Sequence, residues 1–280
     1  MKVLVTGSAG QLGRDVVAVL ERDESIEPFA ADALVDDPVA IASSVDAVGP
    51  DVVIHCAAMT DVDRCERDPE RARAVNATGT QNVARAAAAA GAHLVYVSTD
   101  YVFDGRSWRP YTETDEPNPI SVYGATKLAG ERACPPEATV VRTSWLSGVH
   151  GANFVTAILR LADSPGELRI VDDQRGSPTC TADLADALVA LARDRRPGCF
   201  HVTNAGDASR YELAREVVAR SGGDPGRVRP IATAELDPPR PAARPAYSVL
   251  DNSTFVAAGY KALPDWRDGL ARLLVALERR

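Results

Sequence analysis

The sequence predicts an α/β fold, with a doubly wound parallel sheet in the first half of the chain and a smaller C-terminal α/β lobe. Two observations support this. From residue 2 to about residue 145, short β-branched runs alternate with helical segments, which is typical of parallel strands joined by crossover helices. After that point the alternation becomes less regular. We therefore expect residues 1–145 to form the main domain and residues 146–280 to form mostly a substrate-binding lobe.

The elements of the first half are marked by apolar runs, helix caps and glycine stops. The predicted strands are 2–6, 26–31, 51–56, 93–98 and 139–144. The predicted helices are one that starts after Gly13, then about 39–48, 68–90 and 121–134. Asp37 and Pro38 suit the start of the second helix, and Gly91 suits the end of the third. The run 51–56 is apolar on both faces, as a buried parallel strand should be.

In the second half of the chain, the sequence predicts helices separated by irregular segments. The predicted helices are 153–162, 181–193, 211–221 and 267–277. A short strand at 198–203 lies in a segment, about 180–205, that we expect to return to the main sheet. Residues 170–179 are predicted as a loop. Residues 225–245 are rich in proline, arginine and glycine, which indicates irregular surface structure.

Composition restricts the class of protein. The chain has 280 residues, a net charge of −8 and 25% charged residues, which argues against a general nucleic-acid-binding protein. No apolar run approaches the roughly 20 residues needed to cross a bilayer. The five cysteines are odd in number and form no Cys-x-x-Cys pair, so neither a disulfide framework nor a zinc site is indicated. The chain enters a strand at once, without a signal peptide, so we expect a cytoplasmic protein with reduced thiols.

A glycine-rich turn between the first strand and the first helix predicts a dinucleotide site. Gly7, Gly10 and Gly13 allow a tight turn and a close approach of the main chain to a pyrophosphate. Gln11 and Leu12 belong to the same turn, where the helix start offers free N–H groups. The alternative is a purely structural turn. The position directly after the first strand favours the dinucleotide site and thus a Rossmann-type domain.

Two further places along the sheet edge suit the cofactor. Asp32 ends the second strand, where a carboxylate can bind the ribose 2′-hydroxyl of NADH, although a helix-capping role is the alternative. Arg14 is a candidate counter-charge for a phosphate, so NADPH also stays open. The small residues Cys56, Ala57 and Ala58 follow the third strand, where a dinucleotide would lie, although they also suit close helix packing.

Three residues predict the chemistry of a carbonyl reductase. Tyr123 and Lys127 are one helical turn apart, which places a phenol and an ammonium on one face. An ammonium near a phenol favours the phenolate and eases proton delivery. Thr99 ends the fourth strand, where its hydroxyl can orient a carbonyl oxygen, and Ser98 is the alternative. Tyr-x-x-x-Lys alone occurs often by chance, so the prediction depends on its combination with the glycine turn and the α/β order.

This combination resembles the short-chain dehydrogenase/reductase superfamily in its extended form, and more narrowly the dTDP-4-dehydrorhamnose reductase family. The similar segments extend along nearly the whole chain. They are 59–66 (MTDVDRCE), 98–105 (STDYVFDG), 123–131 (YGATKLAGE), 142–145 (RTSW), 173–179 (DQRGSPT) and 263–266 (LPDW). Residues 34–37 depart from the family pattern before the second helix.

The resemblance implies NADPH- or NADH-dependent reduction of the 4-keto group of dTDP-4-dehydro-L-rhamnose to dTDP-L-rhamnose. It implies Thr99, Tyr123 and Lys127 as the catalytic residues, with Lys127 also holding the nicotinamide ribose. The residues implied around the sugar are Val62, Asp63, Thr99, Asp100 and Trp145, although Trp145 would also suit packing. Arg240 and Arg244 lie in an arginine-rich segment that would suit either a diphosphate or a surface salt bridge. The resemblance leaves a homodimer open, and we assign no metal ligands.

Other functions remain open at this stage. A relative could reduce another dTDP-4-keto-6-deoxysugar with the same chemistry and different pocket residues. A non-catalytic dinucleotide-binding regulatory subunit is disfavoured because it would not need the proton donor. A dehydratase or epimerase is disfavoured because Tyr101, and not a second acid, follows Asp100.

Overall fold

The central sheet has six parallel strands in the order β2-β1-β3-β4-β5-β10, in a computed structural model that describes residues 1–278. The strands are β1 (Lys2–Thr6), β2 (Glu27–Ala31), β3 (Val52–His55), β4 (His93–Thr99), β5 (Thr139–Thr143) and β10 (Gly198–His201). The strand order switches direction at β1, which has β2 on one side and β3 on the other. At such a switch point the carboxyl ends of the strands open a crevice for a ligand. The predicted Rossmann-type parallel sheet is confirmed.

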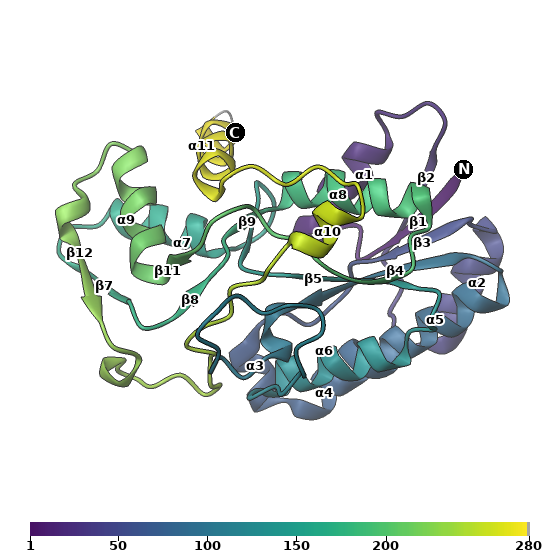
Figure 1. The fold of residues 1–280 in the computed structure, drawn as a ribbon, viewed down its shortest axis with the longest axis horizontal. Helices are drawn as coiled ribbons and strands as arrows, with labels where there is room; N and C mark the ends of the chain where they lie inside the picture. Colours follow the sequence, from purple (N-terminus) through teal and green to yellow (C-terminus); the bar gives the residue numbers. More distant parts are fainter. Residues whose placement is uncertain (279–280) are drawn as a thin grey trace.

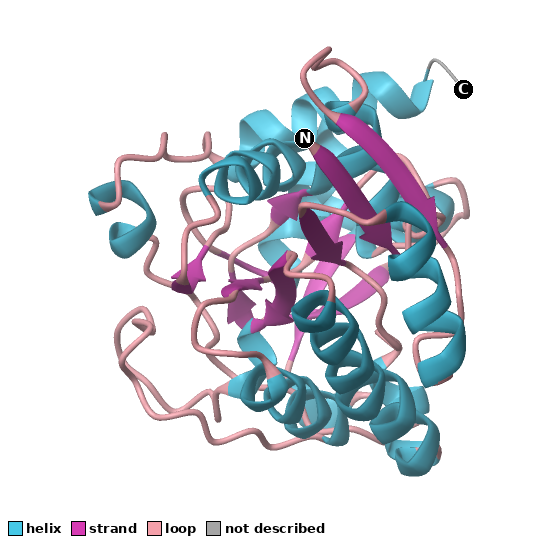
Figure 2. Ribbon diagram, turned by 90° about the vertical axis from the view of Figure 1, so that its right-hand side faces the viewer, coloured by secondary structure: helices cyan, strands magenta, loops and turns pink. Residues whose placement is uncertain are grey.

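Helices cover both faces of this sheet (Figures 1 and 2). One face carries α1 (Gln11–Leu20) and α8 (Thr181–Asp194), which pack against each other. The other carries α2 (Pro38–Val48), α5 (Gly79–Ala89) and α6 (Val122–Ala133). All four residues of β3 are buried, as expected for a strand covered on both faces. The sheet edge that holds the carboxyl ends is therefore the opening left for a ligand.

The predicted helix at 68–90 is interrupted. It consists of α4 (Pro69–Arg73), a π-helical turn (Ala74–Thr78) and α5, and it is preceded by α3 (Val62–Arg67), which we did not predict. Asn76 lies in the π turn and is fully buried. Its side chain accepts from the N–H of Met59 at 2.8 Å and donates to the Met59 carbonyl at 3.1 Å. π turns are frequent at functional sites, and this one fixes the segment that leaves β3.

The smaller lobe lies beside the carboxyl edge of the sheet, on the left of Figure 1. Its helices are α7 (Phe154–Ala162), α9 (Arg210–Arg220) and α11 (Trp266–Glu278). Its strand pairs are β6 (Leu146–Ser147) with β9 (Thr179–Cys180), β7 (Leu168–Val171) with β12 (Val228–Ile231), and β8 (Arg175–Gly176) with β11 (Ala208–Ser209). A separate apolar core includes Trp266, Leu213 and Ile158. The intervening α8, β10 and α10 (Ser253–Ala257) belong to the main sheet and its core.

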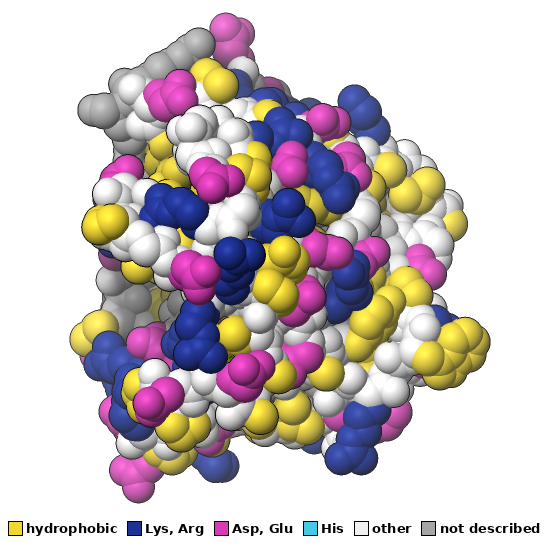
Figure 3. All heavy atoms as spheres, turned by 90° about the vertical axis from the view of Figure 1, so that its left-hand side faces the viewer, with side chains coloured by type: hydrophobic (Ala, Val, Ile, Leu, Met, Phe, Trp, Pro, Cys, Tyr) yellow, Lys and Arg dark blue, Asp and Glu magenta, His cyan; other side chains and the backbone are white. Residues whose placement is uncertain are grey.

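Two predictions for this lobe are wrong. The predicted loop at 170–179 contains the end of β7 and the whole of β8, and the predicted irregular segment at 225–245 contains β12. β7 and β12 pair in parallel although about 60 residues separate them, so tertiary contact decides their structure. Figure 3 shows acidic and basic side chains interspersed on this outer face. Arg169–Glu235 and Arg229–Glu167 are two of the ion pairs there. Among residues 1–278, no helix is long and apolar enough to span a membrane.

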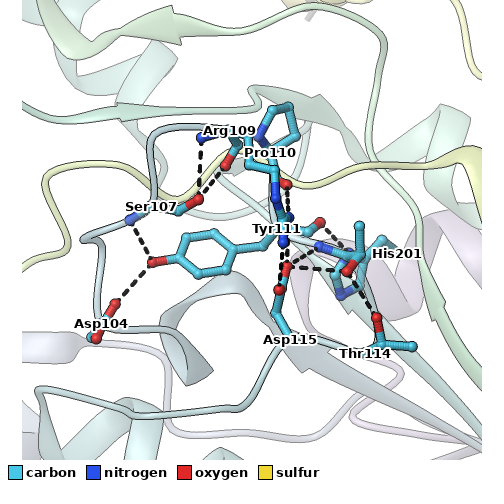
Figure 4. Close-up of polar contacts among 9 residues, drawn as sticks. Asp104, Ser107, Arg109, Pro110, Tyr111, Thr114, Asp115 and His201 are labelled. Atoms are coloured by element: carbon cyan, nitrogen blue, oxygen red, sulfur yellow. Dashed lines mark hydrogen bonds and ion pairs between the residues drawn. The ribbon is translucent and has the colours of Figure 1, made fainter.

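The long connection between β4 and α6 is fixed by its own side chains and by β10 (Figure 4). The Tyr111 ring stacks on Phe103 at 4.2 Å, and its hydroxyl donates to Asp104 at 2.9 Å. The Tyr111 carbonyl contacts Nδ1 of His201 in β10 at 3.0 Å. A connection held in this way sets the position of α6 relative to the end of β4.

Candidate active site

The glycine turn brings the end of β1 close to the main chain that follows β3 and to the start of α1. Gly7 has φ +68°, and a Cβ there would lie 2.7 Å from the Ala57 main chain. A Cβ on Gly13 would lie 2.2 Å from the carbonyl oxygen of Gly7. Larger residues would therefore clash with the protein's own main chain and push the turn away from β3 and the start of α1. The donors at this helix start suit a pyrophosphate.

A cavity of about 370 Å³ lies between this turn, the ends of β4 and β5, and the smaller lobe. The predicted site residues that line it are Gly7, Gly10, Gln11, Leu12, Gly13, Cys56, Ala58, Val62, Thr99, Asp100, Tyr123, Lys127 and Trp145. A neighbouring cavity of about 270 Å³ shares Gly7 and Gly10 and adds Asp32 and Ala57. Asp63 lines neither. The structure thus brings nearly all of the predicted residues to one continuous crevice.

The second cavity contains the carboxylate that the sequence predicts for the adenosine ribose. The Asp32 carboxylate accepts from the Ser8 hydroxyl and from the Ala9 N–H, both at 3.0 Å. The cation that lines this cavity is Arg71, which is ion-paired with Asp36. Arg14, our candidate counter-charge, donates instead to the Ala9 carbonyl at 2.9 Å. Asp32 therefore fixes the turn after β1 and lines this cavity together with Arg71.

Tyr123 lies in the first turn of α6 with its ring against that of Tyr101, at 5.7 Å in an edge-to-face arrangement. Ser121 caps this helix by accepting from the Gly124 N–H at 3.2 Å. A Cβ on Gly124 would lie 2.0 Å from the Tyr101 carbonyl, so glycine permits this close approach. Burial raises the pKa of the Tyr123 hydroxyl, and hydrogen bonding with Thr99 opposes the shift. The phenol is therefore held protonated beside Thr99.

Lys127 is buried one turn further along α6. Its ammonium donates to the Val97 carbonyl at 2.6 Å and lies 4.2 Å from the centre of the Tyr96 ring. Burial lowers its pKa to about 8, while Glu131 acts in the opposite direction. The expected direct effect of this ammonium on the phenol is not the dominant one here, because burial controls the pKa of Tyr123. Lys127 has two donors left for a ligand in the cavity.

Thr99 and Asp100 form a buried hydroxyl–carboxylate group at the end of β4. The Thr99 hydroxyl donates to Oδ1 of Asp100 at 3.0 Å. Ser144 and Ser248 donate to Oδ2 at 2.9 and 2.6 Å. Burial raises the pKa of Asp100, and these hydroxyls oppose that shift. Sequence reasoning missed Ser248, because no local pattern connects it to a carboxylate 148 residues away.

Ser98, the alternative to Thr99, has its hydroxyl on another partner. It donates to Glu131, whose carboxylate also accepts from Arg142 at 3.0 and 2.7 Å. Both members of this ion pair are buried. Of the two adjacent hydroxyls, that of Thr99 is the one that interacts with Tyr123.

An arginine and two aromatic rings form the wall toward the smaller lobe. The Arg210 guanidinium lies 3.5 Å from the centre of the Trp145 ring and 5.0 Å from that of Phe154. Trp145 has φ +46°, an uncommon conformation for a large side chain. Gly176 makes room for its ring, since a Cβ there would lie 2.6 Å away. The sequence contains no signal that singles out Arg210.

A further cavity of about 630 Å³ continues from this wall into the smaller lobe. Arg169, Arg210, Arg240 and Arg244 line it, and Asp61 is its acidic residue. Arg240 and Arg244 both bind Asp63, with the shortest contacts at 3.2 and 2.6 Å. Asp63 therefore faces these arginines and not the place expected for the sugar. The sequence left two alternatives for Arg240 and Arg244, a diphosphate or a salt bridge. In the structure both form a salt bridge with Asp63.

Comparison with known proteins agrees with this geometry. A family profile described as "RmlD substrate binding domain" matches residues 1–279. A dTDP-4-dehydrorhamnose reductase of Mycobacterium tuberculosis is 46% identical, over 98% of this chain and 93% of that protein. A dTDP-4-keto-6-deoxy-D-glucose reductase of Streptomyces niveus is 42% identical, over 96% and 95%.

A solved structure shares the fold along its full length. It is the dTDP-4-dehydrorhamnose reductase of Bacillus anthracis in complex with NADP, with a TM-score of 0.92, 37% identity, and coverage of 98% of this chain and 99% of that one. The family match and these relatives extend over both lobes of the chain described above. The chain belongs to the RmlD substrate binding domain family.

Proposed function

We propose that this protein reduces the 4-keto group of dTDP-4-dehydro-L-rhamnose to give dTDP-L-rhamnose, with NADPH or NADH as the reductant. The observation that supports this most strongly is the single cavity lined by the glycine turn, Thr99, Tyr123 and Lys127. It joins a dinucleotide cradle to a proton donor and a carbonyl-orienting hydroxyl.

The residues of the main domain fit the cofactor. Glycine at positions 7 and 13 permits a tight turn between β1 and α1, and the N–H groups at the start of α1 suit a pyrophosphate. Asp32 suits the adenosine ribose, and Lys127 suits the nicotinamide ribose with its remaining donors. When bound, the nicotinamide supplies the hydride.

Tyr123 supplies the proton. Its hydroxyl is kept protonated by burial and lies beside Thr99. As charge develops on the substrate oxygen, transfer of the phenolic proton neutralises it. The Thr99 hydroxyl donates to Asp100 in the free protein and turns to the substrate oxygen to orient it.

The Lys127 ammonium stabilises the phenolate that remains after proton transfer, since an opposite charge nearby favours the ionised form. Asp100 keeps the hydroxyls of Ser144 and Ser248 oriented toward it, so that the end of β4 stays fixed during the reaction. In this mechanism Tyr123 donates the proton, and Thr99 and Asp100 position the reacting groups.

The arginine-lined cavity suits the dTDP part of the substrate. The partly buried Arg210 guanidinium lies against two rings and interacts with the Tyr101 hydroxyl, and it takes part in none of the ion pairs found among residues 1–278. A diphosphate would supply the missing anion, and bidentate binding by a guanidinium favours it. Trp145 and Phe154 offer flat apolar surface next to the charge.

A second candidate is the reduction of another dTDP-4-keto-6-deoxysugar. It is favoured by the Streptomyces niveus relative, which is named a dTDP-4-keto-6-deoxy-D-glucose reductase and is nearly as similar as the rhamnose-pathway relative. The chemistry at Tyr123 would be unchanged, and only the fit of the sugar would differ.

The test is to offer the purified protein each ketosugar with NADH and with NADPH. Nicotinamide absorbance gives the rate, and NMR of the product gives the sugar and its configuration at C4. Oxidation only with dTDP-4-dehydro-L-rhamnose supports the first proposal, and a preference for dTDP-4-keto-6-deoxy-D-glucose supports the second. Failure to oxidise either nucleotide with any ketosugar would refute both.

The proposal places the reaction in the cytoplasm, where the five free cysteines of the described chain stay reduced. A homodimer is the assembly that we propose to test, by light scattering of the purified protein at several concentrations.

A further inference from the structure

Helix α3 is a single short helix that contacts both sides of the site. Its N-cap Asp61 accepts from the Arg64 N–H at 2.9 Å. Val62, the first residue of α3, lines both the central cavity and the arginine-lined cavity. The same helix carries two carboxylates, Asp63 and Glu66, that bind different parts of the molecule.

Glu66 binds the start of the helix that carries Tyr123. Its carboxylate accepts from the Val122 N–H at 2.8 Å. Val122 is the first residue of α6, and Tyr123 follows it. A carboxylate at a helix N-terminus satisfies a free donor and interacts favourably with the helix dipole. Glu66 thus fixes the main chain one residue before the proposed proton donor.

Asp63 binds the segment 240–244 of the substrate side. Arg244 donates to both of its oxygens, at 2.6 and 2.8 Å. The Ala242 N–H and Arg240 add contacts at 3.2 Å each. Hydrogen bonding from Arg244 holds the pKa of Asp63 well below its usual range. This link stays ionised across the neutral pH range.

The helix packs directly against α6, and its Cys65 is fully buried between these contacts. Displacement of Asp63 by segment 240–244 would therefore move Glu66 as well, because both are on the same six-residue helix. A six-residue helix held at both ends has little room to absorb such a movement.

We propose that Glu66 is a positioning residue for Tyr123, and that α3 couples segment 240–244 of the substrate side to the placement of the proton donor. This inference rests on the proposed function. It adds that the position of segment 240–244 beside the substrate cavity sets the geometry of proton transfer, because Asp63 and Glu66 lie on the same helix. Small misplacements of a catalytic group are costly, up to roughly 10²-fold for about 1 Å.

Three substitutions of Glu66 separate geometry from charge. Glu66→Gln keeps an acceptor at the same reach, Glu66→Asp keeps the charge but shortens the reach, and Glu66→Ala removes both. We expect turnover to fall by roughly 10–100-fold in the Ala and Asp variants and by less than about 3-fold in the Gln variant. Binding of NADH and KM for the nucleotide sugar should change by less than about 3-fold. Glu70→Ala, an exposed glutamate of α4, is the matched control with unchanged turnover.

The split between turnover and KM distinguishes positioning from general loss of stability. In Glu66→Ala the loss should be in turnover and not in KM, while the melting temperature accounts for only a minor loss of folded protein at the assay temperature. Turnover of the Ala variant within about 2-fold of wild type would overturn the inference. So would equal losses in turnover and NADH affinity, because they would indicate collapse of the whole site.

Hydrogen exchange supplies a readout that does not depend on activity. Peptides spanning residues 120–127 should exchange faster in Glu66→Ala and also in Arg244→Ala, which breaks the other end of the coupling. Unchanged exchange in Arg244→Ala would overturn the coupling. An inactive wild-type protein that shows the expected exchange changes would refute only the proposed function, so the two failures are distinguishable.

Discussion

The two halves of the candidate site are built from different materials. The dinucleotide half consists of main chain and small residues from contiguous segments, such as Gly7 to Gly13 and Cys56 to Ala58. The substrate half consists of large cationic and aromatic side chains from distant segments, such as Trp145, Arg210 and Arg244. The first half recognises a ligand by leaving space and offering backbone donors. The second does so by presenting charge, and most of that charge is already paired.

Those pairs give the halves different sensitivities. In the substrate half, Arg240 and Arg244 share the single carboxylate of Asp63, Glu235 lies 3.7 Å from Arg169, and Arg210 is in no ion pair among residues 1–278. In the dinucleotide half, the cation next to Asp32 is Arg71, and it is paired with Asp36. We therefore expect substitutions between the halves, at the chemistry, to affect turnover most. Substitutions within one half should affect one ligand and spare the other.

The largest expected effect is at Tyr123, where the two halves meet. Tyr123→Phe removes the proton donor and keeps the ring, so turnover should fall by roughly 10²–10⁴-fold while both ligands still bind. The measurement is steady-state turnover together with titration of NADH and dTDP. Tyr111→Phe is the control, because that tyrosine is also buried and hydrogen-bonded but lies outside the cavity (Figure 4). Near-normal turnover of Tyr123→Phe would contradict the proposed mechanism.

The next effect is a pH dependence of stability from Lys127, beneath the same meeting point. Its pKa is about 8 in the folded protein against an ordinary 10.5, because burial disfavours the charge. Between these values the unfolded chain binds more protons, so the free energy of unfolding should rise with pH, by at most about 3 kcal/mol from this group. Cys56 and Cys134, which also interact with Lys127, have pKa values raised to about 12 and stay neutral in this range.

Urea denaturation at several values between pH 7.5 and pH 10 measures this effect. Lys127→Met removes the titrating group and keeps most of the apolar stem. The wild-type protein should gain stability relative to this variant as the pH rises. A constant difference between the two proteins across the range would contradict the lowered pKa.

The same contrast explains what the sequence could predict. The dinucleotide half depends on local signals, because the glycine turn, the cap at Asp37 and the Tyr123–Lys127 spacing all act within a few residues. These predictions agree with the structure, as do the five main strands. The substrate half depends on long-range contacts: Asp63 and Arg244 are 181 residues apart, and Asp100 and Ser248 are 148 apart. A single sequence contains no local pattern that would pair them.

The elements that we missed follow the same rule. β7 and β12 become strands by pairing with each other. Helix α3 spans only six residues, and its Asp63 and Glu66 side chains bind Arg244 and the Val122 N–H from distant segments. The resemblance to a family supplied Asp63 and Asp100 as residues around the sugar, but it could not show that the Asp63 carboxylate is bound by Arg240 and Arg244. That required the arrangement of side chains.

A moderate effect is expected at Arg210, in the substrate half alone. Arg210→Ala should raise KM for the nucleotide sugar by roughly 10–100-fold, because hydrogen bonds to charged groups contribute about 1.5–3 kcal/mol. Affinity for NADH should stay unchanged. Arg210→Lys should restore little, since an ammonium cannot stack as a planar guanidinium does between Trp145 and Phe154.

Calorimetric titration with dTDP measures the Arg210 effect without turnover. Arg240→Ala is the matched control from the same cavity, because its side chain is 58% exposed and Arg244 still binds Asp63. Equal losses of dTDP affinity in the two variants would show that bulk positive charge, and not the stacked guanidinium, binds the diphosphate.

The smallest expected effect is in the dinucleotide half and concerns the choice of cofactor. Asp36→Asn releases Arg71 from its ion pair, so Arg71 becomes available to the 2′-phosphate that distinguishes NADPH from NADH. Because the Arg71 side chain is 41% exposed, the gain should be modest, about 2–5-fold in the ratio of NADH to NADPH dissociation constants, and it should weaken with salt. Asp46→Asn, an exposed acid farther along α2, is the control for net charge. An equal change in both variants would show that the ratio reflects overall charge, and a change in NADH affinity alone would place the effect at Asp32 and its ribose.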